Sequence, residues 1–106
     1  MSDVKFKSKG KEYTLEYDFN SLIGIEEVFG VNFLNGDQLN LKKEGISLRQ
    51  LREYLFIGLQ AHHSNDFKNA EEVGRMIEIS KMNEIIEKIA EAILAACNLV
   101  NPDQVT

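Results

Sequence analysis

Residues 47–63 read SLRQLREYLFIGLQAHH, and this stretch predicts the central helix of the fold. Ser47 and Gln50 have the spacing of a capping box, in which each side chain bonds to the backbone N–H of the other residue. Apolar side chains then recur at helical spacing, at Leu48, Leu51, Leu55 and Leu59. Because every residue from 54 to 59 is apolar or glycine, we expect the second half of this helix to be buried on all sides.

One glycine, at position 58, interrupts this apolar run. Glycine in a helix interior costs about 1 kcal/mol relative to alanine. A glycine in such a place usually has a packing reason, because the missing side chain allows a close approach. We therefore expect the backbone of another part of the chain to pass close to the central helix at Gly58.

The start of the chain has the alternation of a β-hairpin. Apolar Val4 and Phe6 alternate with lysines, and residues 13–17 alternate in the same way. The sequence Ser-Lys-Gly-Lys between these two runs is a turn signal. We therefore expect a hairpin over residues 3–17, with its lysines on one exposed face and its apolar face packed on the helix that follows.

Periodic apolar residues predict three further helices. One begins at a cap, Asp18 or Asn20, and ends at Phe29; the other two cover residues 70–79 and 81–99. The side chains expected on their buried faces are Leu22, Ile25 and Phe29 in the first, with Val28 beside them, Val73, Met76 and Ile77 in the second, and Met82, Ile85, Ile86, Ile89, Ile93, Ala96 and Cys97 in the last.

The sequence therefore predicts a mainly α protein of the α+β class, an N-terminal β-hairpin followed by a bundle of about four helices. We expect a single domain over residues 1–100 and a short frayed tail over residues 101–106. The chain has 106 residues, of which 43% are apolar and 27% charged, the balance of a globular domain.

Charge and hydropathy exclude several kinds of partner. Twelve Lys and Arg stand against seventeen Asp and Glu, a formal net charge of −5. An acidic chain of this kind repels phosphates, so no nucleic-acid partner is expected. No apolar run reaches the roughly 18 residues of a membrane helix, and no hydrophobic stretch follows the first residues. Neither a membrane span nor a signal peptide is expected.

Residues that often carry catalysis or bind metals are few and scattered. His62 and His63 are adjacent, and neighbouring side chains on a helix point about 100° apart, so the pair cannot hold one metal ion unaided. We expect both histidines to be solvated at the end of the central helix. Cys97 lies in an apolar run and is expected to pack as a small hydrophobic residue. With no phosphate-binding glycine motif either, the sequence predicts no enzyme, no cofactor and no metal.

The segment between the first helix and the central helix, residues 31–45, is the least regular part of the chain. It holds four large apolar side chains, Phe33, Leu34, Leu39 and Leu41. These side chains could either cover the core or form a patch for a partner, and they are our candidate partner-binding residues. Self-association is a second possibility, because the wide apolar stripe of the last helix could pair with a copy of itself.

Four stretches resemble one known family, the phage tail assembly chaperones, in the branch shared with gene transfer agents. The stretches are GKEYTL at residues 10–15, YDFNSLIGIEEVFG at 17–30, SLRQL through IGL at 47–59, and AEEVGRMI at 70–77. In their order and in their amino-acid sequences, these stretches are similar to the hairpin and the first three helices of that family. The resemblance covers about residues 10–97.

This resemblance implies a non-enzymatic role in the host cytoplasm. Such chaperones coat the tape measure protein, shield its apolar stretches and help to recruit tail tube subunits around it. They are not expected in the mature virion. The resemblance thus implies the tape measure protein as partner, with the tail tube protein as a further partner, and we expect Phe33 and Leu34 to touch the client.

Two other interpretations have different consequences. The helices expected within residues 70–94 have the outline of a helix-turn-helix, which would make the protein a small DNA-binding regulator. However, the second of these helices carries Glu84, Glu87 and Glu91, whose charges repel phosphates. The other interpretation is an enzyme that uses His62 and His63.

Overall fold

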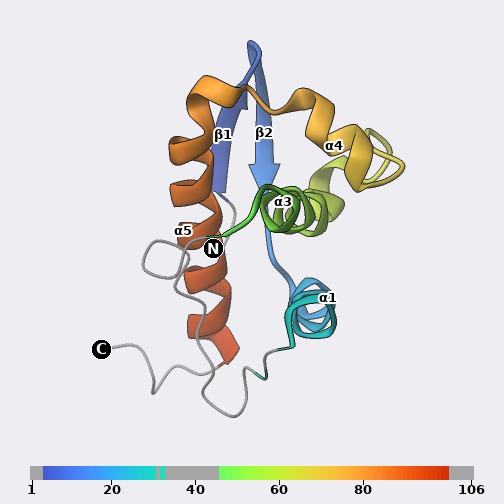
Figure 1. Ribbon diagram of the computed structural model, residues 1–106. Helices are drawn as coiled ribbons and strands as arrows, with labels where there is room; N and C mark the ends of the chain where they lie inside the picture. The colour runs from blue at the N-terminus through green and yellow to red at the C-terminus, as the bar shows by residue number, and fades with distance from the viewer. Residues whose placement is uncertain (1–3, 31, 33–45, 101–106) are drawn as a thin grey trace.

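The computed structural model describes residues 4–30, 32 and 46–100, and of residues 97–100 only the backbone. Its elements, in chain order, are β1 (Val4–Ser8), β2 (Lys11–Leu15), α1 (Phe19–Phe29), α3 (Leu48–His63), α4 (Ala70–Met76), η2, a 3₁₀ turn (Ile79–Lys81), and α5 (Met82–Val100). The predicted fold class is confirmed, since an antiparallel hairpin precedes four α-helices in the described residues (Figure 1). The frayed tail predicted at residues 101–106 lies outside them, and the single domain over residues 1–100 stays a prediction.

The hairpin forms around a two-residue turn. Val4 pairs with Leu15 at its open end, and Ser8 pairs with Lys11 next to the turn. Lys9 and Gly10 both have positive φ, of 53° and 81°, which matches the twist of the two strands. The inward side chains of β1 are buried and its lysines are exposed, as the alternation predicts.

The hairpin does not pack on the helix that follows it, so that prediction is wrong. Strand β2 packs against α3, and β1 packs against α5, which runs beside it in Figure 1. Helix α1 instead packs against α3, on the side away from the hairpin turn. The physical reason is area: the fully buried Leu55, Leu59 and Ile89 of the longer helices cover an apolar strand face that the short α1 could not.

Helix α3 begins at the predicted capping box. The Ser47 hydroxyl accepts from the Gln50 backbone N–H at 3.1 Å, and the Gln50 side-chain oxygen accepts from the Ser47 N–H at 2.9 Å. The predicted stripe holds except at its start: Leu48, in the first turn, is 71% exposed. The second half is not buried all round either, because Phe56 and Ile57 are only half-buried.

The prediction of a close approach at Gly58 is confirmed. The Glu16 N–H donates to the Gly58 carbonyl at 2.9 Å, so the backbone after β2 crosses α3 at this residue. A Cβ on Gly58 would lie 2.6 Å from the Tyr17 ring. Burial raises the pKa of the Tyr17 hydroxyl well above its ordinary 10.0. That hydroxyl therefore stays protonated and donates to the Tyr54 carbonyl at 2.6 Å.

Helix α1 has the predicted bounds. Asp18 is its N-cap, and Gly30 closes it with a left-handed φ of 71°. Leu22 and Ile25 are buried as predicted, and Val28, which was expected beside this face, is exposed. Successive helix residues are turned by about 100°, and Val28 falls to one side of the face that the other apolar residues share.

The cap of α1 makes the stability of the protein depend on pH. Hydrogen bonds from the backbone N–H and hydroxyl of Ser21 hold the pKa of the Asp18 carboxyl below its ordinary 3.8. A lowered folded-state pKa means that the charged cap contributes stability above the unfolded pKa, and that this contribution is lost as the pH falls through the folded pKa.

We expect Asp18→Ala to lower the free energy of unfolding by about 1 kcal/mol at neutral pH. Asp18→Asn should have nearly the stability of the wild type at neutral pH, and its stability relative to the wild type should rise below pH 3.8. Urea denaturation at neutral pH and below pH 3.8 measures the free energy of unfolding of each variant. A wild-type advantage over Asp18→Ala that is unchanged in acid would contradict this.

Helix α4 ends at Met76, three residues before the predicted end, and η2 then leads into α5. Its predicted cap, Asn69, accepts from the Glu72 N–H at 3.0 Å. The early end has a tertiary cause. The buried Ser8 hydroxyl donates to the Met76 carbonyl at 2.5 Å and accepts from the Glu78 N–H at 2.9 Å. The Ser8 side chain of β1 thus bonds the Met76 carbonyl and the Glu78 N–H, two backbone groups that a longer α4 would pair within the helix.

Candidate functional site

The predicted partner-binding residues lie outside the described residues. These are Phe33, Leu34, Leu39 and Leu41, within residues 33–45. Their contact with a client therefore stays a prediction. The predicted place of the Cys97 side chain in the core also lies outside what the structure describes. Within the described part of the chain, a surface that binds an apolar segment of a partner has to consist of exposed apolar side chains.

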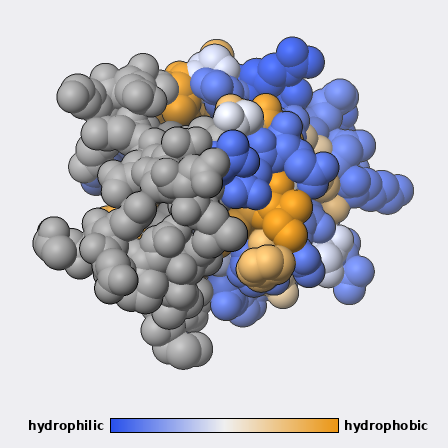
Figure 2. Space-filling model, turned by 90° about the horizontal axis from the view of Figure 1, so that it is seen from below, coloured by the Kyte–Doolittle hydropathy of each residue, from blue (hydrophilic) through white to orange (hydrophobic). Residues whose placement is uncertain are grey.

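Helix α1 carries such residues on the side away from the core. Phe19 is 73% exposed, and Ile23, one helical turn further, is also exposed. Residues four apart share a face of a helix, so the two side chains form one apolar strip, here called the α1 strip. Figure 2 views the molecule from the side on which α1 lies in Figure 1, and it shows hydrophobic side chains at the surface among hydrophilic ones.

A hollow of about 300 Å³ lies between α1 and α3, and neither Phe19 nor Ile23 is among its lining residues. Its lining is mixed: the apolar or small residues are Gly24, Phe56, Ile57 and Ala61, and the polar residues are Asp18, Asn20, Ser21 and Gln60. The missing side chain of Gly24 leaves room there, since a Cβ on it would lie 3.8 Å from Ile57. An exposed apolar strip on a helix suits an apolar segment of a partner protein.

Sequence reasoning missed the α1 strip. Its signal was present, because Phe19 directly follows the cap Asp18 and Ile23 points about 100° away from Leu22. The predicted core face of this helix leaves Phe19 and Ile23 outside it, and that remainder is the signal for an exposed apolar strip.

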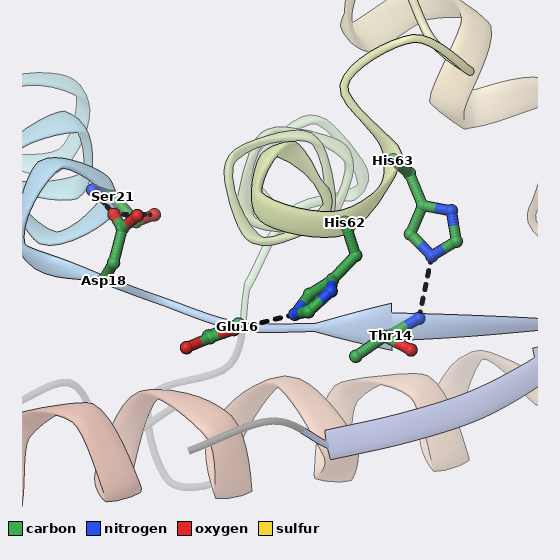
Figure 3. Close-up of polar contacts among 6 residues, drawn as sticks. All are labelled: Thr14, Glu16, Asp18, Ser21, His62 and His63. Atoms are coloured by element: carbon green, nitrogen blue, oxygen red, sulfur yellow. Dashed lines mark hydrogen bonds and ion pairs between the residues drawn. The ribbon is translucent and has the colours of Figure 1, made fainter. Parts of the chain in front are cut away.

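The two histidines differ in surroundings (Figure 3). His62 is 42% exposed and its Nε2 lies 2.7 Å from Glu16 Oε1. The His63 side chain is only 14% exposed, and its Nε2 accepts from the Thr14 backbone N–H at 3.0 Å. The prediction that both are solvated is therefore wrong for His63. It bonds the outer edge of β2, beside which no third strand lies in the described part of the chain.

The bonds of His63 also limit its chemistry. Because Nε2 accepts from Thr14, the ring proton is on Nδ1, which donates to Asp66 Oδ2 at 2.9 Å. A carboxylate on Nδ1 is the arrangement of a general base. In this protein, however, the Thr14 N–H occupies the nitrogen that would take a substrate proton. The geometry makes His63 a structural residue that joins α3 to β2.

We expect His63→Ala to lower the free energy of unfolding by about 1–2 kcal/mol, because the Thr14 N–H loses its acceptor. His62→Ala is the matched control, since the exposed ion pair with Glu16 should contribute less than about 1 kcal/mol. Urea denaturation of both variants measures the difference. Equal stability of the two variants would show that the bond to Thr14 has no structural weight.

The other chemical possibilities find little support in the described residues. In that part of the chain, no group of three or more His, Cys, Asp or Glu side chains is placed to hold a metal ion. Searching the same residues reveals no helix with the length and apolar character of a membrane span. The would-be recognition helix of the DNA-binding interpretation, α5, packs its apolar face on β1 and exposes Glu84, Glu87 and Glu91.

No protein-family model matches the chain, and comparison with curated proteins and with solved structures finds no match either.

Proposed function

We propose that this protein is a phage tail assembly chaperone whose client is the tape measure protein. The observation that carries the proposal is the α1 strip, because the apolar side chains of Phe19 and Ile23 are both exposed on α1. The second of the four stretches that resemble the family, residues 17–30, contains this helix. In this proposal the chaperone acts in the host cytoplasm and helps to recruit tail tube subunits before the virion is complete.

The physical reason for such a surface is the nature of the client. A long protein that has to stay unassembled exposes apolar stretches, and these aggregate unless another apolar surface covers them. Covering them costs solubility unless the complex carries charge, and the chaperone brings a formal net charge of −5. The role needs no reacting group.

Co-expression with the tape measure protein of the same phage tests the proposal. An affinity tag on the tape measure protein should capture the untagged chaperone, and size-exclusion chromatography should show several copies in the complex. The variant Phe19→Gln/Ile23→Gln should reduce this capture at least about tenfold, roughly 1.4 kcal/mol of binding free energy.

Leu94→Gln is the matched control, because Leu94 is an exposed apolar residue on a different helix, α5. Its capture should equal that of the wild type. Absence of capture of the folded wild-type protein would refute the proposed function. An equal loss of capture in Phe19→Gln/Ile23→Gln and in Leu94→Gln would show that the α1 strip is not the binding surface.

A further inference from the structure

A second apolar groove lies on a different part of the molecule, between the first turn of α3, the end of α4 and η2. Its volume is about 630 Å³. Leu48 and Ile79, which line it, are 71% and 79% exposed. Ile77 and Met82 line it as well, and both are only half-buried. Single exposed apolar residues are common on protein surfaces, but several around one hollow are typical of a binding groove.

The charged residues of this groove all have the same sign. Lys9, Arg49, Arg52 and Arg75 line it, and none of the described lining residues carries a carboxylate. The concentration of cations runs against the chain's formal net charge of −5. The nearby carboxylate of Glu78 accepts from the Lys9 backbone N–H at 2.8 Å, so it is already engaged.

Arg52 adds an unfilled hydrogen bond. Its Nε is buried and has no hydrogen-bond partner among the described residues. Its stem lies over Gly74 of α4, where a Cβ would come within 3.2 Å of Arg52 Cδ. An unsatisfied buried N–H is unfavourable, and a guanidinium forms its strongest pairs with carboxylates. Arg52 lines the groove together with Arg49 and Arg75, so a carboxylate in the groove would meet a cluster of guanidinium groups.

We propose that this groove binds a segment of a partner protein in which apolar side chains are flanked by Asp or Glu. The apolar side chains would lie on Leu48 and Ile79, and the carboxylates would pair with the arginines around them. A nucleic acid fits the charges but leaves the apolar walls without a use. The inference goes beyond the proposed function; if that function holds, the segment belongs to the tape measure protein or the tail tube protein.

Two designed helical peptides with the same leucine positions test the groove, one flanked by glutamates and the other by lysines. Fluorescence anisotropy with the purified full chain should show the acidic peptide binding at least about tenfold more tightly, and its affinity should fall as salt is added. Leu48→Gln and Arg49→Glu should each weaken this binding several-fold. Leu94→Gln and Lys5→Glu make the same chemical changes at exposed sites outside the groove and should leave it unchanged.

Several outcomes would overturn the inference. These are equal affinity for both peptides, affinity unaffected by Leu48→Gln and Arg49→Glu, or binding of a DNA duplex through these residues in place of the peptide. Self-association that Leu48→Gln abolishes, without peptide binding, would assign the groove to a second copy and also overturn it. Capture of the tape measure protein without peptide binding would leave the proposed function standing and remove only the groove. Peptide binding without capture of the tape measure protein would leave the groove standing and refute the proposed function.

Discussion

Gly58→Ala is expected to destabilise the fold by about 1–3 kcal/mol, although alanine is the better helix former. The gain in helix propensity is about 1 kcal/mol. Against it, the new methyl would lie 2.6 Å from the Tyr17 ring and hydroxyl and 2.9 Å from Leu15 Cδ2. Both side chains are buried, and overpacking of a core commonly costs about 1–3 kcal/mol or more. To relieve this clash, the backbone at residues 15–17 would have to move away from α3. That movement would break the hydrogen bond from the Glu16 N–H to the Gly58 carbonyl.

Gly24→Ala is the matched control for this prediction. Gly24 also lies inside a helix, but a Cβ there would meet Ile57 at 3.8 Å, an ordinary contact. We expect Gly24→Ala to be neutral or to stabilise the protein by up to about 1 kcal/mol. Urea denaturation of both variants gives the comparison. If Gly58→Ala were as stable as Gly24→Ala, the crossing of α3 by the Leu15–Tyr17 backbone would be wrong.

Ser8→Ala is expected to cost about 2–3 kcal/mol, an unusually large effect for the loss of one hydroxyl. The side chain is fully buried and makes two bonds to the chain after α4, as donor to the Met76 carbonyl and acceptor from the Glu78 N–H. Alanine removes both, and each buried group left unpaired costs about 1–3 kcal/mol. The end of α4 should also loosen, which faster amide hydrogen exchange at Glu78 would report.

Ser80→Ala is the control for the hydroxyl itself, because Ser80 is exposed in η2. Surface substitutions of this kind usually change stability by less than about 0.5 kcal/mol. A Ser8→Ala variant that unfolds at the same urea concentration as Ser80→Ala would contradict the role assigned to the two bonds.

Local signals in the sequence were enough to place the elements. The capping box at Ser47, the cap at Asn69 and the glycine after Phe29 each act within a few residues, so each can be recognised from the sequence alone. Gly58 was informative for another reason. Its low helix propensity needed a tertiary explanation, and the structure supplies one.

Distant contacts could not be predicted in the same way. The end of α4 depends on Ser8, which is 68 residues from Met76, and nothing near Met76 in the sequence marks this contact. His63 forms its bond to Thr14 across 49 residues. Periodicity likewise predicts which residues share a face but not how far the neighbouring elements cover it. For that reason the sequence predicts Leu48 on the buried stripe, and it indicates binding surfaces only at residues 33–41 and on the last helix.

The central claim is that this chain keeps the tape measure protein soluble, and a centrifugation assay tests it most directly. The tape measure protein is expressed alone, with the wild-type chain, and with Phe19→Gln/Ile23→Gln, and its fraction in the supernatant is measured. The account predicts a pellet when it is expressed alone, a soluble complex with the wild-type chain, and a return toward the pellet with the variant. The same partition in all three, with the chain folded, would contradict the claim.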